Sequence, residues 1–336
     1  MSIGTVFLLV YYVGLLDSPI SQVQRQLASI QRALASVNRT REFFDLRPDV
    51  TEGTAGPRAP LPAGSPPVRF EGVSFAYKDR RTTSDERRTT SDEPAAPEAT
   101  DVVLRDVTFA LEPGRVLGVL GRTGSGKTTL TRLLFRLYDV DAGAIRLGET
   151  DIRAAGLGDL RRHIGMVTQD VQLFAATVRD NLTLFGAYDP ARPALDDARI
   201  VDALETLGLG GWYRDLPDGL DTVLESGGKG LSAGEAQLLA FTRVFLRDPQ
   251  LVVLDEASSR LDPATEQLLE RAIDRLLAGR TGIIIAHRLR TVGRADDILI
   301  LEGGRVVEHG PRLALAADPG SRFYGLLQTG LEEVLA

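Results

Sequence analysis

The chain has 336 residues, of which 43% are hydrophobic and 25% charged, and this composition is typical of one large or two modest globular domains. Its formal net charge of −7 argues against a nucleic-acid-binding protein, whose surface is usually basic, so we expect no nucleic-acid partner. The chain contains no cysteine, which excludes disulfides and thiolate metal sites.

The N-terminal segment 3–16, IGTVFLLVYYVGLL, is apolar and uncharged. A membrane-spanning helix needs about 20 apolar residues, so this run alone is too short. A signal peptide is the simpler alternative, but the segment lacks a basic start and no clear small-residue cleavage site follows. We therefore interpret it as the end of a transmembrane helix.

A long helix is predicted to continue from this segment, because apolar residues recur at steps of three and four from Ile20 onward. The heptad stripe comprises Ile20, Val23, Leu27, Ile30, Leu34, Val37 and Phe44. An ordinary amphipathic core helix would show the same stripe. In either case the apolar face requires a partner helix.

Residues 47–67 are rich in Pro, Gly and Ala, which predicts a linker and the first domain boundary. Residues 68–77 then alternate as a strand does, and a second strand-like run follows at 102–111. Between these runs the heptapeptide RRTTSDE occurs twice in tandem, at 80–93. The polar repeat predicts a solvated loop over 80–100, to which we assign no chemistry.

Beyond this loop, short apolar runs alternate with helical patterns. Strands are predicted at 116–120, 251–255 and 282–286, and a closing β-hairpin at 298–310. Such alternation is typical of an α/β domain with a largely parallel sheet. Residues from about 176 to 247 are mostly helical in pattern, which predicts an inserted helical subdomain.

The strongest motif is GRTGSGKTT at 121–129, which fits G-x-x-x-x-G-K-S/T directly after a buried strand and at the start of a helix. Glycines let backbone N–H groups surround phosphate oxygens, and the helix start adds partial positive charge. Lys127 supplies a cation for the β and γ phosphates, and Thr128 offers its hydroxyl to Mg²⁺. We expect ATP to contact Gly121, Arg122, Thr123, Gly124, Ser125, Gly126, Lys127, Thr128 and Thr129.

A second motif, LVVLDEA, ends an apolar strand in two carboxylates. Asp255 is placed to hold Mg²⁺ through water, and Glu256 to act as the general base on the attacking water. Alone the motif is a weak signal, but after a phosphate-binding loop it predicts hydrolysis of ATP.

With these motifs in order, the sequence from about Val68 to the C-terminus (68–336) resembles the ATP-binding cassette of ABC transporters. The resemblance implies a P-loop NTPase fold with an antiparallel β subdomain beside the parallel core sheet. Tyr77 in FAY then resembles the residue that stacks on adenine, although it could be an ordinary strand aromatic. Gln169 in MVTQD resembles the glutamine that senses Mg²⁺ and contacts the membrane domain.

Two further residues take their roles from the same resemblance. Asp262 in SSRLD corresponds to the position that reaches across the cassette dimer. His287 ends a predicted buried strand in IIIAHRL and corresponds to the histidine that contacts the γ-phosphate. A neutral histidine can donate that hydrogen bond, so it need not titrate.

The segment LSAGE resembles the family's LSGGQ signature, which faces the ATP held by the other subunit. Ser232 and Gly234 are retained, whereas Ala233 and Glu235 replace a glycine and a glutamine. Glu235 can avoid the phosphates by bonding back to the Ser232 N–H in a capping box. The segment therefore either works normally or forms the weaker of two unequal sites in a heterodimer. Upstream, Glu225 resembles the acidic residue of an exporter loop that touches the membrane domain, with one extra residue of spacing.

The resemblance implies an ATPase that powers export across the cell membrane, with its cassette on the cytoplasmic side and residues 1–46 as the end of a membrane helix and its extension. Its expected partners are a membrane domain and a second cassette, in a homodimer or, as the altered signature favours, a heterodimer. Alternatives are a soluble ABC ATPase, a module that only binds nucleotide, and a truncated, non-functional half-transporter.

Overall fold

The computed structural model describes residues 3–45, 48, 50, 59–77, 101–168, 171–186, 195–255, 263–286 and 289–329. The chain divides into two compact units, Met1–Thr51 and Glu52–Ala336. The tandem repeat of RRTTSDE lies outside the described residues.

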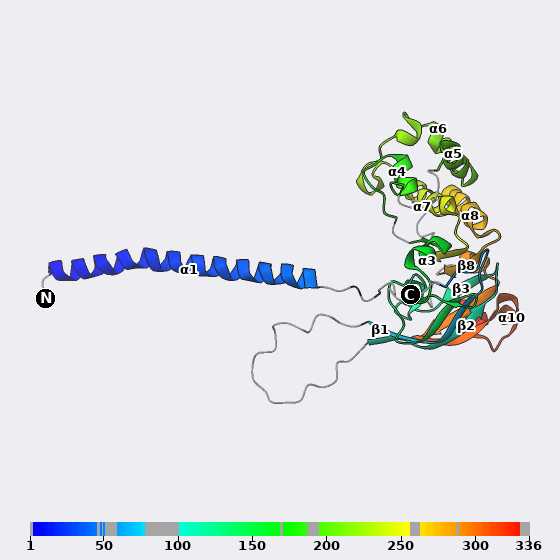
Figure 1. Cartoon of the computed structure of the whole chain (residues 1–336), viewed down its shortest axis with the longest axis horizontal. Helices are drawn as coiled ribbons and strands as arrows, with labels where there is room; N and C mark the ends of the chain where they lie inside the picture. The colour runs from blue at the N-terminus through cyan, green and yellow to red at the C-terminus, as the bar shows by residue number, and fades with distance from the viewer. Residues whose placement is uncertain are drawn as a thin grey trace. The chain divides into compact units, whose positions relative to one another are not determined.

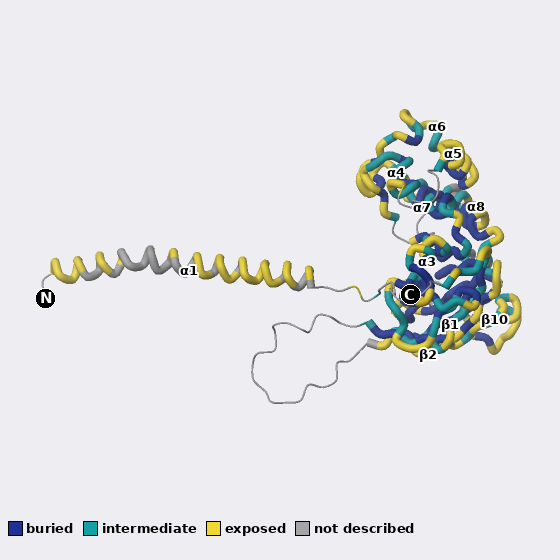
Figure 2. Tube along the Cα trace, in the orientation of Figure 1, coloured by how far each residue is buried: buried dark blue, intermediate teal, exposed yellow. Residues whose placement is uncertain are grey.

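The first unit is one helix, α1 (Ile3–Asp45), of 43 residues. Three residues of its predicted apolar stripe, Leu27, Ile30 and Leu34, are each more than half accessible (57%, 56% and 57%). Figure 2 shows exposed residues in the described parts of the helix. Across the described part of the chain, α1 included, we find no helix with both the length and the apolar character that crossing a bilayer requires.

The core of the second unit is a six-stranded sheet, counted over the described residues, with strand order β10-β9-β3-β8-β7-β6. Its strands are β3 (Val116–Leu120), β6 (Ile164–Val167), β7 (Leu251–Asp255), β8 (Thr281–Ile285), β9 (Asp297–Glu302) and β10 (Arg305–Pro311). All pairs are parallel except β9 with β10, which form a hairpin. The strands β3 and β8 are buried along their whole length, which explains why they are continuous apolar runs.

A second, antiparallel sheet of four described strands has the order β2-β1-β4-β5. Its members are β1 (Val68–Tyr77), β2 (Asp101–Leu111), β4 (Ala142–Leu147) and β5 (Thr150–Asp151). Phe70 and Phe109 stack inside it with ring centroids 4.6 Å apart. The predicted fold class, with a mostly parallel core sheet and an antiparallel β subdomain, is therefore confirmed.

Helices surround these sheets. They include α2 (Lys127–Leu134), α3 (Leu157–His163), α8 (Pro263–Leu277), α9 (Leu289–Val292), α10 (Arg312–Ala317) and α11 (Arg322–Thr329). The others are α4 (Val178–Thr183), α5 (Asp197–Thr206), α6 (Gly210–Arg214) and α7 (Ala233–Arg247), with the 3₁₀ turns η2 (Gly219–Asp221) and η3 (Ser226–Gly228). Figure 1 shows α4, α5 and α6 gathered at one end of this unit.

An arginine joins the helices at that end. Arg179 of α4 donates hydrogen bonds to Asp197 of α5 and, at 3.2 Å, to Asp221 of η2. The hydrogen bond with Asp197 raises the pKa of Arg179 and lowers the pKa of the Asp197 carboxyl. The helical region is thus tied together by charge as well as by its apolar core.

Residues 59–67, the described end of the predicted linker, are hydrogen-bonded to the cassette. Thr150 donates its hydroxyl hydrogen to the Pro60 carbonyl at 2.9 Å. Thr281, fully buried at the start of β8, donates to the Pro66 carbonyl at 2.8 Å. This stretch therefore packs as part of the second unit.

Candidate nucleotide-binding site

The candidate site lies at the carboxyl edge of the parallel sheet. Val119 of β3, Ile285 of β8 and Asp255 of β7 stand in one row across three neighbouring strands. Since strands are about 4.8 Å apart, the backbone of Asp255 lies roughly 10 Å from that of β3. The phosphate-binding loop begins at Gly121, directly after β3, and so emerges at the same edge of the sheet as Asp255, with β8 between them.

The loop passes into α2 through Gly126, which caps the helix in a left-handed conformation with φ 104°. A Cβ added there would lie 2.5 Å from Cδ2 of Leu104, so the position excludes a side chain. Leu130 N donates to the Gly126 carbonyl at 2.9 Å and closes the first helical turn. Because a glycine has no capping side chain, the N–H groups of this turn can bind a ligand.

Lys127 is buried, with 6% of its surface exposed. Its ammonium donates to the carbonyl oxygens of Gly121 at 2.5 Å and Arg122 at 3.1 Å. The ammonium is thereby held inside the curve of the loop. There it can exchange its hydrogen bonds with the carbonyl oxygens for hydrogen bonds with phosphate oxygens.

The remaining loop residues fit a triphosphate with Mg²⁺. Ser125 is 5% exposed, and within the described part of the chain its Oγ has no hydrogen-bond partner, which leaves a hydroxyl for a ligand inside the loop. Thr128 is exposed and Asp255 half-buried. Hydroxyl and carboxylate oxygens are the donors that Mg²⁺ prefers, so Thr128 and Asp255 suit that ion.

Tyr77, at the end of β1, lies against the helix that follows the loop. Its hydroxyl is 3.1 Å from Oγ1 of Thr129 and accepts a hydrogen bond from Arg132 at 3.2 Å. Sequence reasoning placed Thr129 at the phosphates and missed Arg132. The spacing of these two residues, three apart on a helix, puts them on one face and was the available signal.

At the signature segment, the predicted capping box is present. Glu235 N donates to Ser232 Oγ at 3.2 Å, and Ser232 N donates to the Glu235 carboxylate at 2.8 Å. The carboxylate is therefore turned back onto the start of α7. Gly234 has a packing role that the sequence did not reveal, because an added Cβ would lie 1.9 Å from Cγ2 of Thr265 on α8.

Four predicted residues lie outside the described residues: Gln169, Glu256, Asp262 and His287. In sequence, three of them follow parallel strands closely: Gln169 comes two residues after β6, Glu256 one after β7 and His287 two after β8. Their roles remain predictions.

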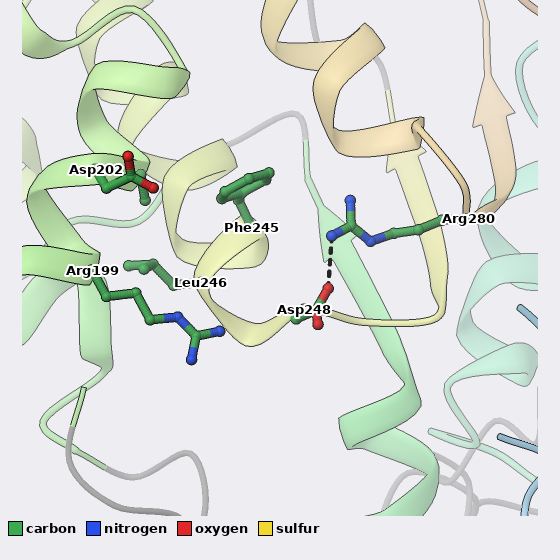
Figure 3. A pocket seen from close by; sticks show the side chains of 7 residues that line it. Arg199, Asp202, Phe245, Leu246, Asp248 and Arg280 are labelled. Atoms are coloured by element: carbon green, nitrogen blue, oxygen red, sulfur yellow. Dashed lines mark hydrogen bonds and ion pairs between the residues drawn. The ribbon is translucent and has the colours of Figure 1, made fainter. Parts of the chain in front are cut away.

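A separate hollow of about 180 Å³ lies near the amino ends of β7 and β8. The phosphate loop follows the carboxyl end of β3, at the opposite edge of the same sheet. Figure 3 shows two of its lining residues, Arg280 and Asp248, directed toward each other, with N and O 2.7 Å apart. The same guanidinium lies over the Phe245 ring, 5.7 Å from its centroid. The hollow is therefore part of the packing among α5, the end of α7 and the loop before β8.

Together, a parallel sheet, a glycine-rich loop between β3 and α2, and a carboxylate on β7 define a P-loop nucleotide-binding domain. Residues 104–259 match the sequence profile of the family described as ABC transporter. The chain therefore carries an ABC transporter ATP-binding cassette.

Known proteins agree with this assignment. The chain is 40% identical over 273 residues to the mycobactin import ATP-binding/permease protein IrtA of Mycolicibacterium smegmatis, covering 81% of this chain and 28% of that protein. It is 37% identical to the ATP-dependent lipid A-core flippase of Pseudomonas fluorescens, covering 99% of this chain and 50% of that protein.

Among solved structures, a bacterial Atm1-family ABC exporter with ATP bound has a TM-score of 0.72 at 29% identity, covering 89% of this chain and 47% of the exporter chain. The chain thus spans about half the length, or less, of these relatives.

Proposed function

We propose that the chain binds Mg²⁺ and ATP at the phosphate loop and hydrolyses ATP as the energy-supplying cassette of an exporter-type ABC transporter. The observation that carries this proposal is the buried ammonium of Lys127, held by two loop carbonyls at the uncapped start of α2. A buried cation held by carbonyl oxygens can exchange them for a stronger anionic partner.

The hydrolysis step is proposed from the order in which these residues follow the strands in the sequence. Lys127 exchanges the carbonyls of the loop for oxygens of the β and γ phosphates. Thr128 and Asp255, with Gln169, would hold Mg²⁺, which when bound neutralises phosphate charge. Glu256 accepts the proton of the attacking water, and His287 donates a hydrogen bond to the γ-phosphate.

We further propose that a second cassette completes the site. Its Ser232 and Gly234 counterparts would face the γ-phosphate, and Asp262 would reach across the dimer. The altered LSAGE sequence favours a heterodimer. A membrane domain is the second partner, which places the cassette at the cytoplasmic side of the cell membrane. The Atm1-family exporter and the flippase support export, whereas one relative is named for import, so transport assays should follow both directions.

The test compares Glu256→Gln and Lys127→Ala with the exposed control Glu112→Gln in the whole chain. For Glu256→Gln we expect ATP affinity to be retained and phosphate release to fall by about 10²- to 10⁴-fold, since that is the contribution of a general base. For Lys127→Ala we expect ATP affinity itself to fall by about 10- to 100-fold, since a charge-assisted hydrogen bond is lost. Calorimetric titration and a phosphate-release assay make both measurements.

A Glu256→Gln variant that hydrolyses ATP at the wild-type rate would remove Glu256 as the base. Unchanged ATP affinity in Lys127→Ala would contradict the proposed phosphate site.

A further inference from the structure

Residues 59–67 form a strap directly before β1, and the first half of this strap is bonded to the antiparallel sheet. Ala59 N donates to the carbonyl of Ala154, in the turn after β5, at 3.1 Å. The carbonyl of Pro60 accepts the hydrogen bond from Thr150 of β5 at 2.9 Å. This half is therefore held at β5, which is the end strand in the order of that sheet.

The second half of the strap is bonded to the start of β8, in the parallel sheet. Ser65 donates its hydroxyl hydrogen to the carbonyl of Gly279, in the loop before β8, at 2.6 Å. Thr281, the first residue of β8, donates to the carbonyl of Pro66 at 2.8 Å. One short segment thus joins the two sheets of the cassette.

Thr281 connects the strap to more than one strand. Its side chain is fully buried, and its hydroxyl also accepts a hydrogen bond from Gly114 N, in the turn before β3, at 3.1 Å. Its backbone N donates at 3.2 Å to the carbonyl of Gln250, directly before β7. This residue therefore fixes the starts of β3, β7 and β8 to one another and to the strap. The candidate nucleotide site lies at the other end of the same three strands.

The phosphate loop depends on the position of both sheets. It follows β3 of the parallel sheet, and its last glycine, Gly126, lies against Leu104 of β2 in the antiparallel sheet. A Cβ added at Gly126 would lie only 2.5 Å from Cδ2 of Leu104. The orientation of the two sheets therefore determines the space that the loop occupies.

The strap is rich in proline, with four prolines among its nine residues, at 60, 62, 66 and 67. Each proline has a fixed φ, so the strap loses little conformational entropy when it docks. A segment restricted in this way is expected to dock and to detach as one piece.

We propose that residues 59–67 act as a clamp that holds the two sheets in a fixed orientation, with Thr281 as the positioning residue that connects the clamp to the strands of the nucleotide site. The clamp keeps Leu104 against Gly126 and so keeps the phosphate loop in its binding shape. Because the strap follows the N-terminal unit in sequence, release of the clamp is a route by which that unit can weaken nucleotide binding. The effect on nucleotide rests on the proposed function and deepens it.

The experiment measures amide hydrogen exchange and Mg²⁺–ATP affinity in the full-length chain. Thr281→Val keeps the shape of the side chain and removes its hydroxyl, whereas Thr281→Ser keeps the hydroxyl. Ser65→Ala breaks the neighbouring hydrogen bond without changing the core. Thr183→Val on α4 is the matched control, because its hydroxyl likewise donates to a backbone carbonyl. The reporter is the amide of Ala59, at the far end of the strap.

In Thr281→Val and in Ser65→Ala, we expect the Ala59 amide to exchange about 3- to 10-fold faster. The loss of one hydrogen bond of ordinary net strength raises the detached population by about that factor. ATP affinity should fall by about 2- to 10-fold, the size of effect that packed elements transmit between distant sites. Thr281→Ser and Thr183→Val should match the wild type in both measurements.

Faster exchange only at amides bonded to the altered side chain, such as that of Gly114, with Ala59 unchanged, would show separate local contacts and no clamp. Wild-type ATP affinity in both Thr281→Val and Ser65→Ala would remove the link to the phosphate loop. Either result overturns the inference. Failure of the proposed function is distinguishable, because the wild-type chain itself would then bind no Mg²⁺–ATP, whereas exchange measured without nucleotide still tests the clamp.

Discussion

The starts of α2 and α7 are both predicted to bind phosphate, and they are built in opposite ways. α2 begins at Gly126, buried and without a capping side chain, with Lys127 folded under the loop. α7 begins at exposed Ser232, which forms a complete capping box with Glu235. No side chain at the N-cap of α2 bonds its first-turn N–H groups, whereas two N–H groups at the start of α7 are bonded by the capping box.

The difference indicates separate roles for the two helix starts in binding one nucleotide. A capping box stabilises its helix by about 1 kcal/mol without a ligand, so the α7 start is self-sufficient. The α2 start depends on the loop conformation and on Lys127 for its order, and it keeps its dipole and donors for an anion. We therefore expect nucleotide to bind first and tightest at α2, and to meet α7 only across a dimer.

The largest effect is expected from Gly126→Ala, which changes the N-cap residue of α2. Its Cβ would enter Leu104 at 2.5 Å, in a conformation with φ 104° that side chains rarely adopt. We expect a loss of about 2 to 4 kcal/mol in the free energy of unfolding, and loss of ATP binding. Denaturant unfolding and calorimetric titration measure the two quantities.

The comparator is Gly124→Ala in the same loop, where an added Cβ meets nothing within 4 Å. Only backbone strain of about 1 to 2 kcal/mol is expected there. Equal destabilisation by the two substitutions would show that contact with Leu104 does not shape the loop.

A smaller effect is expected from Gly234→Ala, which changes the first turn of α7. Alanine favours a helix by about 1 kcal/mol over glycine, but its methyl group would overlap Cγ2 of Thr265 at 1.9 Å. Overpacking of this kind costs about 1 to 3 kcal/mol, so we expect a net loss in unfolding free energy.

The double variant Gly234→Ala, Thr265→Ser tests this cause, because serine keeps the hydroxyl and removes the methyl group. Thermal unfolding should recover most of the lost stability. A Gly234→Ala variant more stable than the wild type would contradict the packing role.

The smallest effect is expected at Glu235. Glu235→Gln keeps an acceptor for the Ser232 N–H and loses only the attraction of a charge to the helix dipole, worth about 0.3 to 1 kcal/mol. Glu235→Ala also loses the hydrogen bond and should cost more. Unfolding midpoints of both variants rank them, and the reverse order would mean that the capping box does not stabilise α7.

Much of the fold was accessible from the sequence because its strands are apolar and bounded by turns. β1, β3 and β7 occupy the predicted residues. β4 and β6 escaped prediction, since β4 begins with exposed small residues and β6 has only four residues, and both are defined by pairing, with β1 and β7.

At the candidate site, interactions between neighbours in sequence could be predicted from the sequence, whereas contacts between residues far apart in sequence could not. The capping box uses neighbours in sequence and was predicted. The contact between Gly234 and Thr265 joins residues on two helices that only folding brings together. The hydrogen bond between Tyr77 and Thr129, 52 residues apart, is likewise formed only on folding.

The most direct test of the difference between the two helix starts is amide hydrogen exchange of the dilute, monomeric Glu256→Gln chain with and without Mg²⁺ and ATP. At ATP concentrations about 100 times Kd, binding stabilises by about 2.7 kcal/mol, so exchange in residues 121–130 should slow by up to about 100-fold. Residues 231–240 should be unchanged. Protection at 231–240 without protection at 121–130 would contradict the account.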